Sequence, residues 1–259
     1  MNNLSAMIWI ETRKAIRSRL PVWTALGALF MPLGIAFLIF VATHPEISKK
    51  LGLISAKANL VAYAATDWAA YLVFVGLFIA AGGFFLFVLI LSWVFGREFA
   101  DGVVKDLLAV PVQRASILMA KFLVSLVWAI GLTVLMFAAS LAMGVVIQLP
   151  GGTLDVILRG GGSVLITALL TILVVTPFAL LASLGRGYLL PMGVAALILM
   201  MANLVALTGR GEFFPWAVPG LFAQGKSALP AVSYIIVLLT GLAGIAGTYL
   251  WWKYADQNR

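Results

Sequence analysis

The sequence predicts an all-α integral membrane protein with six transmembrane helices. Hydrophobic residues make up 63% of its 259 residues, charged residues make up 10%, and the mean hydropathy is +1.12. Soluble domains have roughly 45–50% apolar and 25% charged residues, so this composition lies outside the soluble class. The apolar residues also form runs of about 20 or more, the length that an α-helix needs to cross a bilayer.

Short polar segments separate the six apolar runs. The runs cover residues 21–41, 69–95, 117–147, 164–184, 189–207 and 232–252. Together they indicate a single transmembrane domain over residues 1–259. The third run is longer than one crossing needs, which predicts a helix that tilts or extends beyond the bilayer. Kinks are expected where proline or paired glycine interrupts a run, at Pro32, Gly82, Gly83, Pro177 and Pro191.

The basic residues predict the orientation of the chain. With the N-terminus inside, eleven lysines and arginines lie in the cytoplasm and six lie outside, as the positive-inside rule requires. We therefore expect a multi-pass protein of the cell inner (cytoplasmic) membrane with both termini cytoplasmic. The formal charge of +8 then serves orientation and contact with anionic membrane lipid, and nucleic-acid binding is excluded.

A charged segment over residues 97–110 separates the second and third runs. Apolar residues recur on one side of its helical pattern, at Phe99, Val103, Leu107 and Val110. Charged residues fall on the other side, at Glu98, Asp101 and Lys105. Arg97 to Asp101 and Asp101 to Lys105 are ion-pair spacings. The pattern predicts an amphipathic helix at the membrane surface that ends at Pro111.

Three patches of the sequence resemble type-2 ABC-transporter permeases, most closely the bacitracin and lantibiotic-immunity branch. The family's cytoplasmic coupling helix is similar to the pattern of Glu98, Gly102, Lys105, Leu107, Leu108, Pro111, Arg114 and Lys121. Its N-terminal interfacial helix is similar to residues 1–20, with Glu11, Lys14, Arg17 and Arg19. Its outer re-entrant segment is similar to residues 209–231, with Phe214, Pro215, Trp216 and Pro219. Val103 departs from the family, which usually has threonine after the glycine.

The resemblance implies the membrane-spanning subunit of an ABC exporter, which is not an enzyme and has no catalytic residues. It implies no cofactor on this chain, because ATP and Mg²⁺ are bound by a cytoplasmic ATPase partner. A second permease copy, identical or paralogous, is the other expected partner. The residues expected to dock on the ATPase are Glu98, Asp101, Gly102, Val103, Lys105, Leu107, Leu108 and Arg114. The outer segment, with Phe214, Pro215, Trp216 and Pro219, is expected to act as an outer gate.

The alternative function is a secondary carrier or channel that ATP does not drive. No carboxylate falls well inside any predicted span, whereas ion-coupled carriers usually place ionisable groups within the membrane, so this alternative is disfavoured. Phe78, Phe85 and Asn203 are candidates for the substrate pathway, with lipid contact or helix packing as the open alternatives. The short outer loops and apolar spans fit an amphipathic peptide, antibiotic or lipid better than a bulky polymer.

Two further features of the sequence carry no predicted site. His44 is the only histidine and the chain has no cysteine, so neither a histidine cluster nor a thiolate metal site is expected. Residues 220–227 match the phosphate-loop pattern G-x-x-x-x-G-K-S letter for letter. A phosphate loop joins a strand to a helix N-terminus, but this match lies between Pro219 and Pro230 on the predicted outer face. We therefore reject nucleotide binding there.

Overall fold

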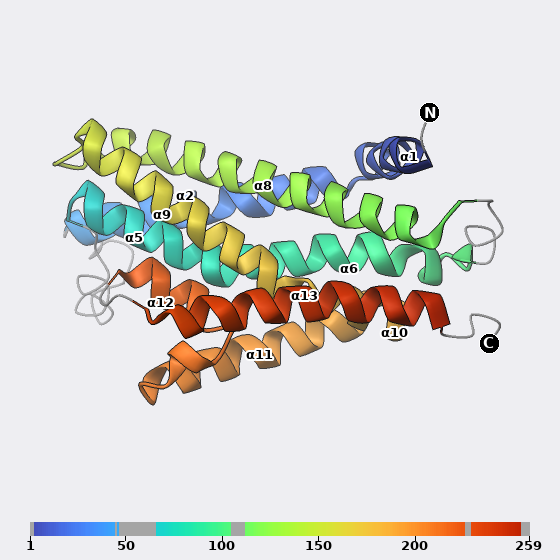
Figure 1. Cartoon of the computed structure of the whole chain (residues 1–259). Coiled ribbons are helices and arrows are strands. Elements are labelled where there is room, and N and C mark those ends of the chain that lie inside the picture. Colours follow the sequence, from blue (N-terminus) through green and yellow to red (C-terminus); the bar gives the residue numbers. More distant parts are fainter. Residues whose placement is uncertain (1–2, 45, 47–65, 105–111, 226–228, 255–259) are drawn as a thin grey trace.

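A computed structural model describes residues 3–44, 46, 66–104, 112–225 and 229–254. Within these residues, six helical spans are long and apolar enough to cross a membrane, which confirms the predicted number. The spans run side by side as an elongated bundle, and the helix at residues 3–17 and the end of the last helix at residue 254 lie at the same end of it (Figure 1). No strand occurs among the described residues.

Each span is formed by one helix or by two consecutive helices. The spans are α2 (Leu20–Thr43), α5 and α6 (Trp68–Phe78 and Phe84–Ala100), α8 (Arg114–Val146), α9 and α10 (Leu154–Val175 and Pro177–Leu184), α11 (Leu189–Leu207) and α13 (Ala231–Tyr254). The helix α1 (Asn3–Arg17) precedes them. A 3₁₀ turn (Gly211–Phe213) and the short helix α12 (Val218–Gln224) lie between α11 and α13.

The two divided spans break where the sequence predicted kinks. Gly82 and Gly83 belong to a π-helical segment, Ile79–Gly83, between α5 and α6. Pro177 has no backbone N–H, so the Leu173 carbonyl loses its helical donor, and Thr176 N lies 3.3 Å from that oxygen instead. The kink expected at Pro191 is wrong. Pro191 lies in the first turn of α11, where a helix needs no donor from it.

The fourth span begins at Leu154, ten residues before the predicted start at 164. Three consecutive glycines, Gly160 to Gly162, weaken the helical pattern there, because glycine costs about 1 kcal/mol relative to alanine inside a helix. Because glycine has no side chain, it also lets two helices pack closely together. A Cβ added to Gly160 would lie 2.3 Å from the Leu72 side chain of α5, so glycine permits α9 to approach α5.

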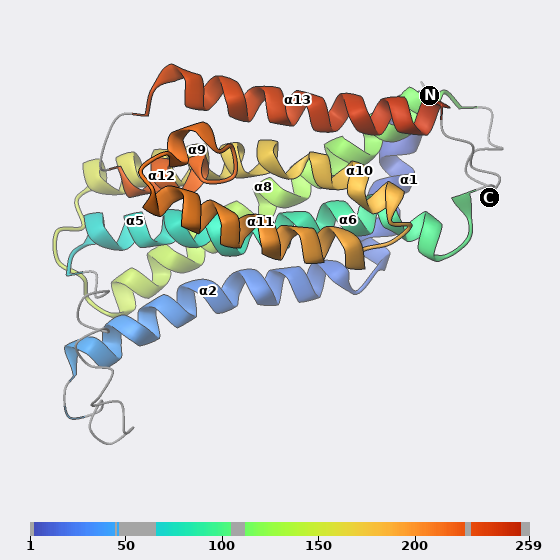
Figure 2. The same ribbon diagram turned by 90° about the horizontal axis from the view of Figure 1, so that it is seen from below.

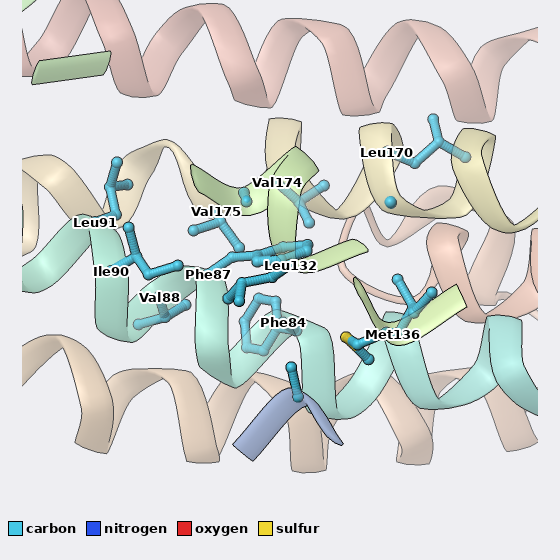
Figure 3. Close-up of a cluster of buried hydrophobic side chains, with 14 of the residues drawn as sticks. Phe84, Phe87, Val88, Ile90, Leu91, Leu132, Met136, Leu170, Val174 and Val175 are labelled. Carbon is cyan, nitrogen blue, oxygen red and sulfur yellow. The ribbon is translucent and has the colours of Figure 1, made fainter. Parts of the chain in front are cut away.

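The centre of the bundle is built around α6, which contacts α2, α8, α9, α10 and α11. Figure 3 shows the labelled side chains of this core, namely Phe84, Phe87, Val88, Ile90 and Leu91 from α6, Leu132 and Met136 from α8, and Leu170, Val174 and Val175 from α9. A helix that is apolar on several faces is typical of such a central position. The helix α6 is therefore in contact with most of the other spans.

The helix α1 lies across the end of the bundle and does not run along it. Figure 1 looks down the axis of α1 while the spans cross the picture, and Figure 2, turned by 90°, shows α1 across their ends. At the opposite end, α12 packs against α5 and α9. The two ends of the bundle therefore have different architectures.

Candidate functional site

Four charged side chains from α1, α6 and α8 meet at one end of the bundle. Lys121 Nζ lies 2.8 Å from both carboxylate oxygens of Glu98 and 3.3 Å from Oε2 of Glu11. Lys14 Nζ lies 2.8 Å from Glu11 Oε1 and 3.0 Å from Glu98 Oε1. We call Glu11, Lys14, Glu98 and Lys121 the charge cluster.

Most of the charge cluster is buried. The residues Lys121, Glu98 and Glu11 are 0%, 3% and 4% exposed. The Lys121 ammonium also donates to the Val94 carbonyl at 2.7 Å, so all three of its donor positions have acceptors. Withdrawing a charge from water costs several kcal/mol unless it is paired and hydrogen-bonded. Each buried charge of the cluster therefore depends on its partners.

The helical spacing of α1 places one face against α8. Met7, Glu11 and Ala15 are its buried residues, and positions four apart share one side of a helix. Met7 packs with Ile117 and Ala120 of α8, beside Glu11. The apolar contact and the ion pairs thus hold α1 on the same neighbour.

Lys14 lies outside the membrane-spanning segments, at the partly exposed edge of the cluster. Burial opposes its charged form, but the carboxylates of Glu11 and Glu98 raise the pKa of Lys14 above its ordinary value of 10.5. A raised pKa in the folded state gives stability that is fully present at neutral pH and is lost only as the pH rises through the folded-state value. Lys14 therefore holds its charge throughout the physiological range.

The position expected for Glu98 is wrong. Residues 97–100 are not the start of a separate amphipathic helix, because they form the last turn of α6. The helix ends with Gly102 at φ +72°, with Gly102 N donating to Phe99 O at 3.3 Å and Val103 N to Glu98 O at 3.0 Å. These two bonds form a Schellman cap, which favours glycine at the left-handed position. Glu98 consequently faces the bundle and not a polar surface.

The remaining residues expected to dock have different surroundings. Asp101 and Val103 are exposed, and the predicted Arg97–Asp101 ion pair is confirmed at 3.2 Å. Lys105, Leu107 and Leu108 lie outside the described residues. Arg114 donates to the carbonyls of Trp252 and Lys253 at 2.6 Å and 3.1 Å, so it connects the start of α8 to the end of α13.

The four charged residues expected in the N-terminal segment lie in two different places. Glu11 and Lys14 belong to the cluster, whereas Arg17 and Arg19 are exposed. Sequence reasoning placed Lys121 within the family pattern but gave it no role. A lone lysine inside a long apolar run was the available signal, because such a charge needs a partner within the protein.

The segment predicted to be re-entrant contacts the bundle through α12, which packs against α5 and α9, and through Trp216. Trp216 Nε1 donates to the Val174 carbonyl at 2.9 Å, next to the break in the fourth span, and its ring contacts Phe214. Pro215 is half-buried, and Pro219 is buried within α12. Residues 220–224 are helical, so the start of the phosphate-loop look-alike follows no strand.

The three candidate pathway residues have different surroundings. Asn203 lines a small cavity of about 110 Å³ together with Trp216 and Gln224, and neither Phe78 nor Phe85 is among its lining residues. The Asn203 amide donates to the Leu199 carbonyl of its own helix at 2.8 Å. Phe78 is exposed, and Phe85 packs partly against the core.

Comparison with known proteins identifies relatives for most of the chain. The sequence model of the family described as ABC-2 family transporter protein matches residues 7–203. The bacitracin transport permease protein BCRB of Bacillus licheniformis is 29% identical over 174 residues, which cover 66% of this chain and 84% of that protein. No solved structure matches the chain at a significant level.

Proposed function

This chain belongs to the ABC-2 transporter family, and on that premise we propose that it is the membrane subunit of an exporter powered by a separate cytoplasmic ATPase. The observation that carries the proposal is the position of the charge cluster. Glu98 lies in the last turn of α6, directly before the charged segment whose sequence resembles a coupling helix. The family supports a transport subunit, and the cluster supplies a physical link from that segment to the spans.

The proposed coupling runs from the segment after Gly102 into three helices. The Glu98 carboxylate is bound to Lys121 of α8 and to Lys14 of α1. Separating a buried ion pair costs about 3–5 kcal/mol, so a displacement of the end of α6 moves α1 and α8 with it. In this scheme, closure of the ATPase subunits on ATP displaces the segment, and the cluster carries the displacement to the spans.

We assign the contact with the ATPase to the exposed residues Asp101 and Val103 and to Lys105, Leu107 and Leu108. Gly102 contributes the turn that ends α6, and the Glu98 carboxylate acts within the bundle through Lys14 and Lys121. The partner holds the ATP and Mg²⁺. A second permease copy completes the transport unit, both termini lie in the cytoplasm, and the protein resides in the inner membrane.

The proposed cargo is an amphipathic peptide antibiotic that is moved outward. Its support is the likeness to a protein named as a bacitracin transport permease, together with the apolar character of the spans. The proposed gate on the outer side is the outer segment, whose Trp216 donates a hydrogen bond to Val174 beside the break in the fourth span. A deletion strain should become more sensitive to such a peptide and regain resistance with the restored gene.

Affinity purification of the full chain in mild detergent tests the central proposal. We expect an ABC ATPase subunit in the purified complex, identified by mass spectrometry, and ATP hydrolysis that accompanies it. Transport by the purified chain in vesicles without any ATPase, driven by an ion gradient, would instead establish the secondary carrier.

Single cysteines test the orientation, because the natural chain has no cysteine. Gln113 and Asp155 are exposed residues that precede α8 and begin α9, at opposite ends of the bundle. In intact cells, a membrane-impermeant thiol reagent should label Asp155→Cys and spare Gln113→Cys, because the basic residues place the latter inside. Permeabilised cells should show labelling of both. The reverse pattern in intact cells would separate the coupling segment from ATP and contradict the proposal.

A further inference from the structure

An apolar groove runs along the outside of the bundle between α8 and α13. It has a volume of about 400 Å³ and is lined by residues of these two helices, including Ala115, Met119 and Tyr249. Ala115 and Leu126 lie at its two ends on α8, which corresponds to a length of about 16 Å at 1.5 Å per residue. One leaflet of a hydrocarbon core about 30 Å thick has about the same depth.

A second, partly open cavity adjoins the groove. Phe122, Leu126 and Ile245 line both the groove and a cavity of about 160 Å³ between α6, α8, α9 and α13. An engineered apolar cavity of about 150 Å³ is large enough to bind benzene and stays free of water. This cavity is therefore large enough for the end of an aliphatic chain, and its apolar walls favour such a chain over water.

One buried polar group faces this space without a partner. Ser125 lines the cavity, is 5% exposed, and its Oγ has no hydrogen-bond partner among the described residues. Burying a hydroxyl without a hydrogen bond is unfavourable. Ser125 is thus a polar exception in a wall formed mainly by apolar side chains, among them Phe87, Leu91 and Val175 (Figure 3).

Two cations lie at the end of the groove near the C-terminus. Arg114 directly precedes Ala115, and its guanidinium bonds to the carbonyls at the end of α13, which leaves further N–H donors on the same group. Lys253 is exposed and follows Tyr249 by one helical turn, on the same side of α13. A groove with an apolar floor and a cationic end is complementary to a lipid with an anionic headgroup.

We propose that this groove is a binding site for one anionic phospholipid. Its phosphate lies at Lys253 and Arg114, one acyl chain follows α8, and the end of that chain occupies the cavity beside Ser125. A flexible chain fits the passage between Phe122, Leu126 and Ile245, whereas a helix of a second protein copy is about 10 Å wide and is too thick to enter. The site does not depend on the transport function proposed above.

Photolabelling of the full chain in proteoliposomes tests this site without any ATPase or cargo. The probe is phosphatidylglycerol with a diazirine near the end of one acyl chain, and mass spectrometry locates the adducts. We expect adducts on Ser125 and Ala129, whose side chains are buried. Labelling of Leu197 and Leu204, which are exposed on α11, confirms that the probe reaches the protein.

Matched variants distinguish the site from general lipid contact. Ile245→Trp narrows the passage and should reduce the Ser125 adduct to background, whereas Leu242→Trp, at an exposed position on the same helix that lines neither space, should leave it unchanged. Labelling of α11 should be equal in both variants, which shows that they are folded. Lys253→Gln should abolish the preference for the phosphatidylglycerol probe over its phosphatidylcholine counterpart.

Three results would overturn the proposal. The first is an unlabelled cavity in a protein whose α11 is labelled, and the second is an unchanged Ser125 adduct in Ile245→Trp. The third is a disulfide between two copies of Met119→Cys with an unlabelled cavity, which would assign the groove to a protein partner. If Lys253→Gln still prefers the phosphatidylglycerol probe, Lys253 does not bind the lipid headgroup.

Discussion

Replacing Lys121 with methionine is expected to destabilise the protein by about 3–5 kcal/mol, the usual cost of breaking a buried ion pair. The change leaves the carboxylates of Glu11 and Glu98 buried with Lys14 as their remaining partner. Thermal unfolding of the purified chain in detergent measures the loss, and we also expect transport to fail. A variant as stable as the natural protein would show that the cluster does not hold the helices together.

Two control variants test whether the loss of stability comes from leaving a buried charge without its partner. Arg159→Met removes an ion pair with Asp155 whose side chains are 82% and 65% exposed, and exposed pairs contribute little to stability. The double variant Glu98→Leu with Lys121→Met removes both charges together and should recover most of the stability, because apolar replacements of buried pairs are often tolerated. If that stable variant still fails to couple ATP hydrolysis to transport, the ion pairs themselves carry the coupling.

Replacing both Leu107 and Leu108 with aspartate is expected to abolish association with the ATPase while the chain still inserts in the membrane. Burying unpaired carboxylates in an apolar partner groove costs several kcal/mol, whereas the same charges on a solvated segment cost little. Co-purification of the ATPase subunit with the tagged chain is the measurement, and membrane fractionation checks insertion.

The control for this second variant changes two leucines at the other end of the bundle. Leu154 and Leu207 are 73% and 85% exposed, and Leu154→Asp with Leu207→Asp introduces the same charge on the proposed outer side. Association should survive in this control. Full recovery of the ATPase with the Leu107 and Leu108 variant would contradict the assignment of the segment as the coupling contact.

The number and order of the spans were predictable because each depends on the length and hydropathy of one continuous run. The breaks at Gly82, Gly83 and Pro177 were predictable for a related reason, since each follows from the local backbone chemistry of one or two residues. The early start of α9 was not predictable. The three glycines weaken its pattern, and their value appears only in the contact of Gly160 with Leu72 of another helix.

The charge cluster could not be predicted from helical periodicity. The pattern around Glu98 placed it with Asp101 on a polar face, but its partner Lys121 is 23 residues away and lies on another helix. Periodicity describes one helix at a time and gives no information on which helices meet. Gly102 was the local signal for a corrected prediction, because glycine after a helical run is the usual residue of a Schellman cap, and a cap there assigns Glu98 to the preceding span.

The charge cluster also imposes an order on the biosynthesis of the chain. Glu11 is translated first, and its partner Lys121 lies 110 residues later. Ribosomes add roughly 5–20 residues per second, so for about 5–20 s after Glu11 is made the helix α1 has no α8 to dock on. The helix α1 is thus fixed only after α8 has been made, and the completed ion pairs mark a protein in which α1, α6 and α8 have already assembled.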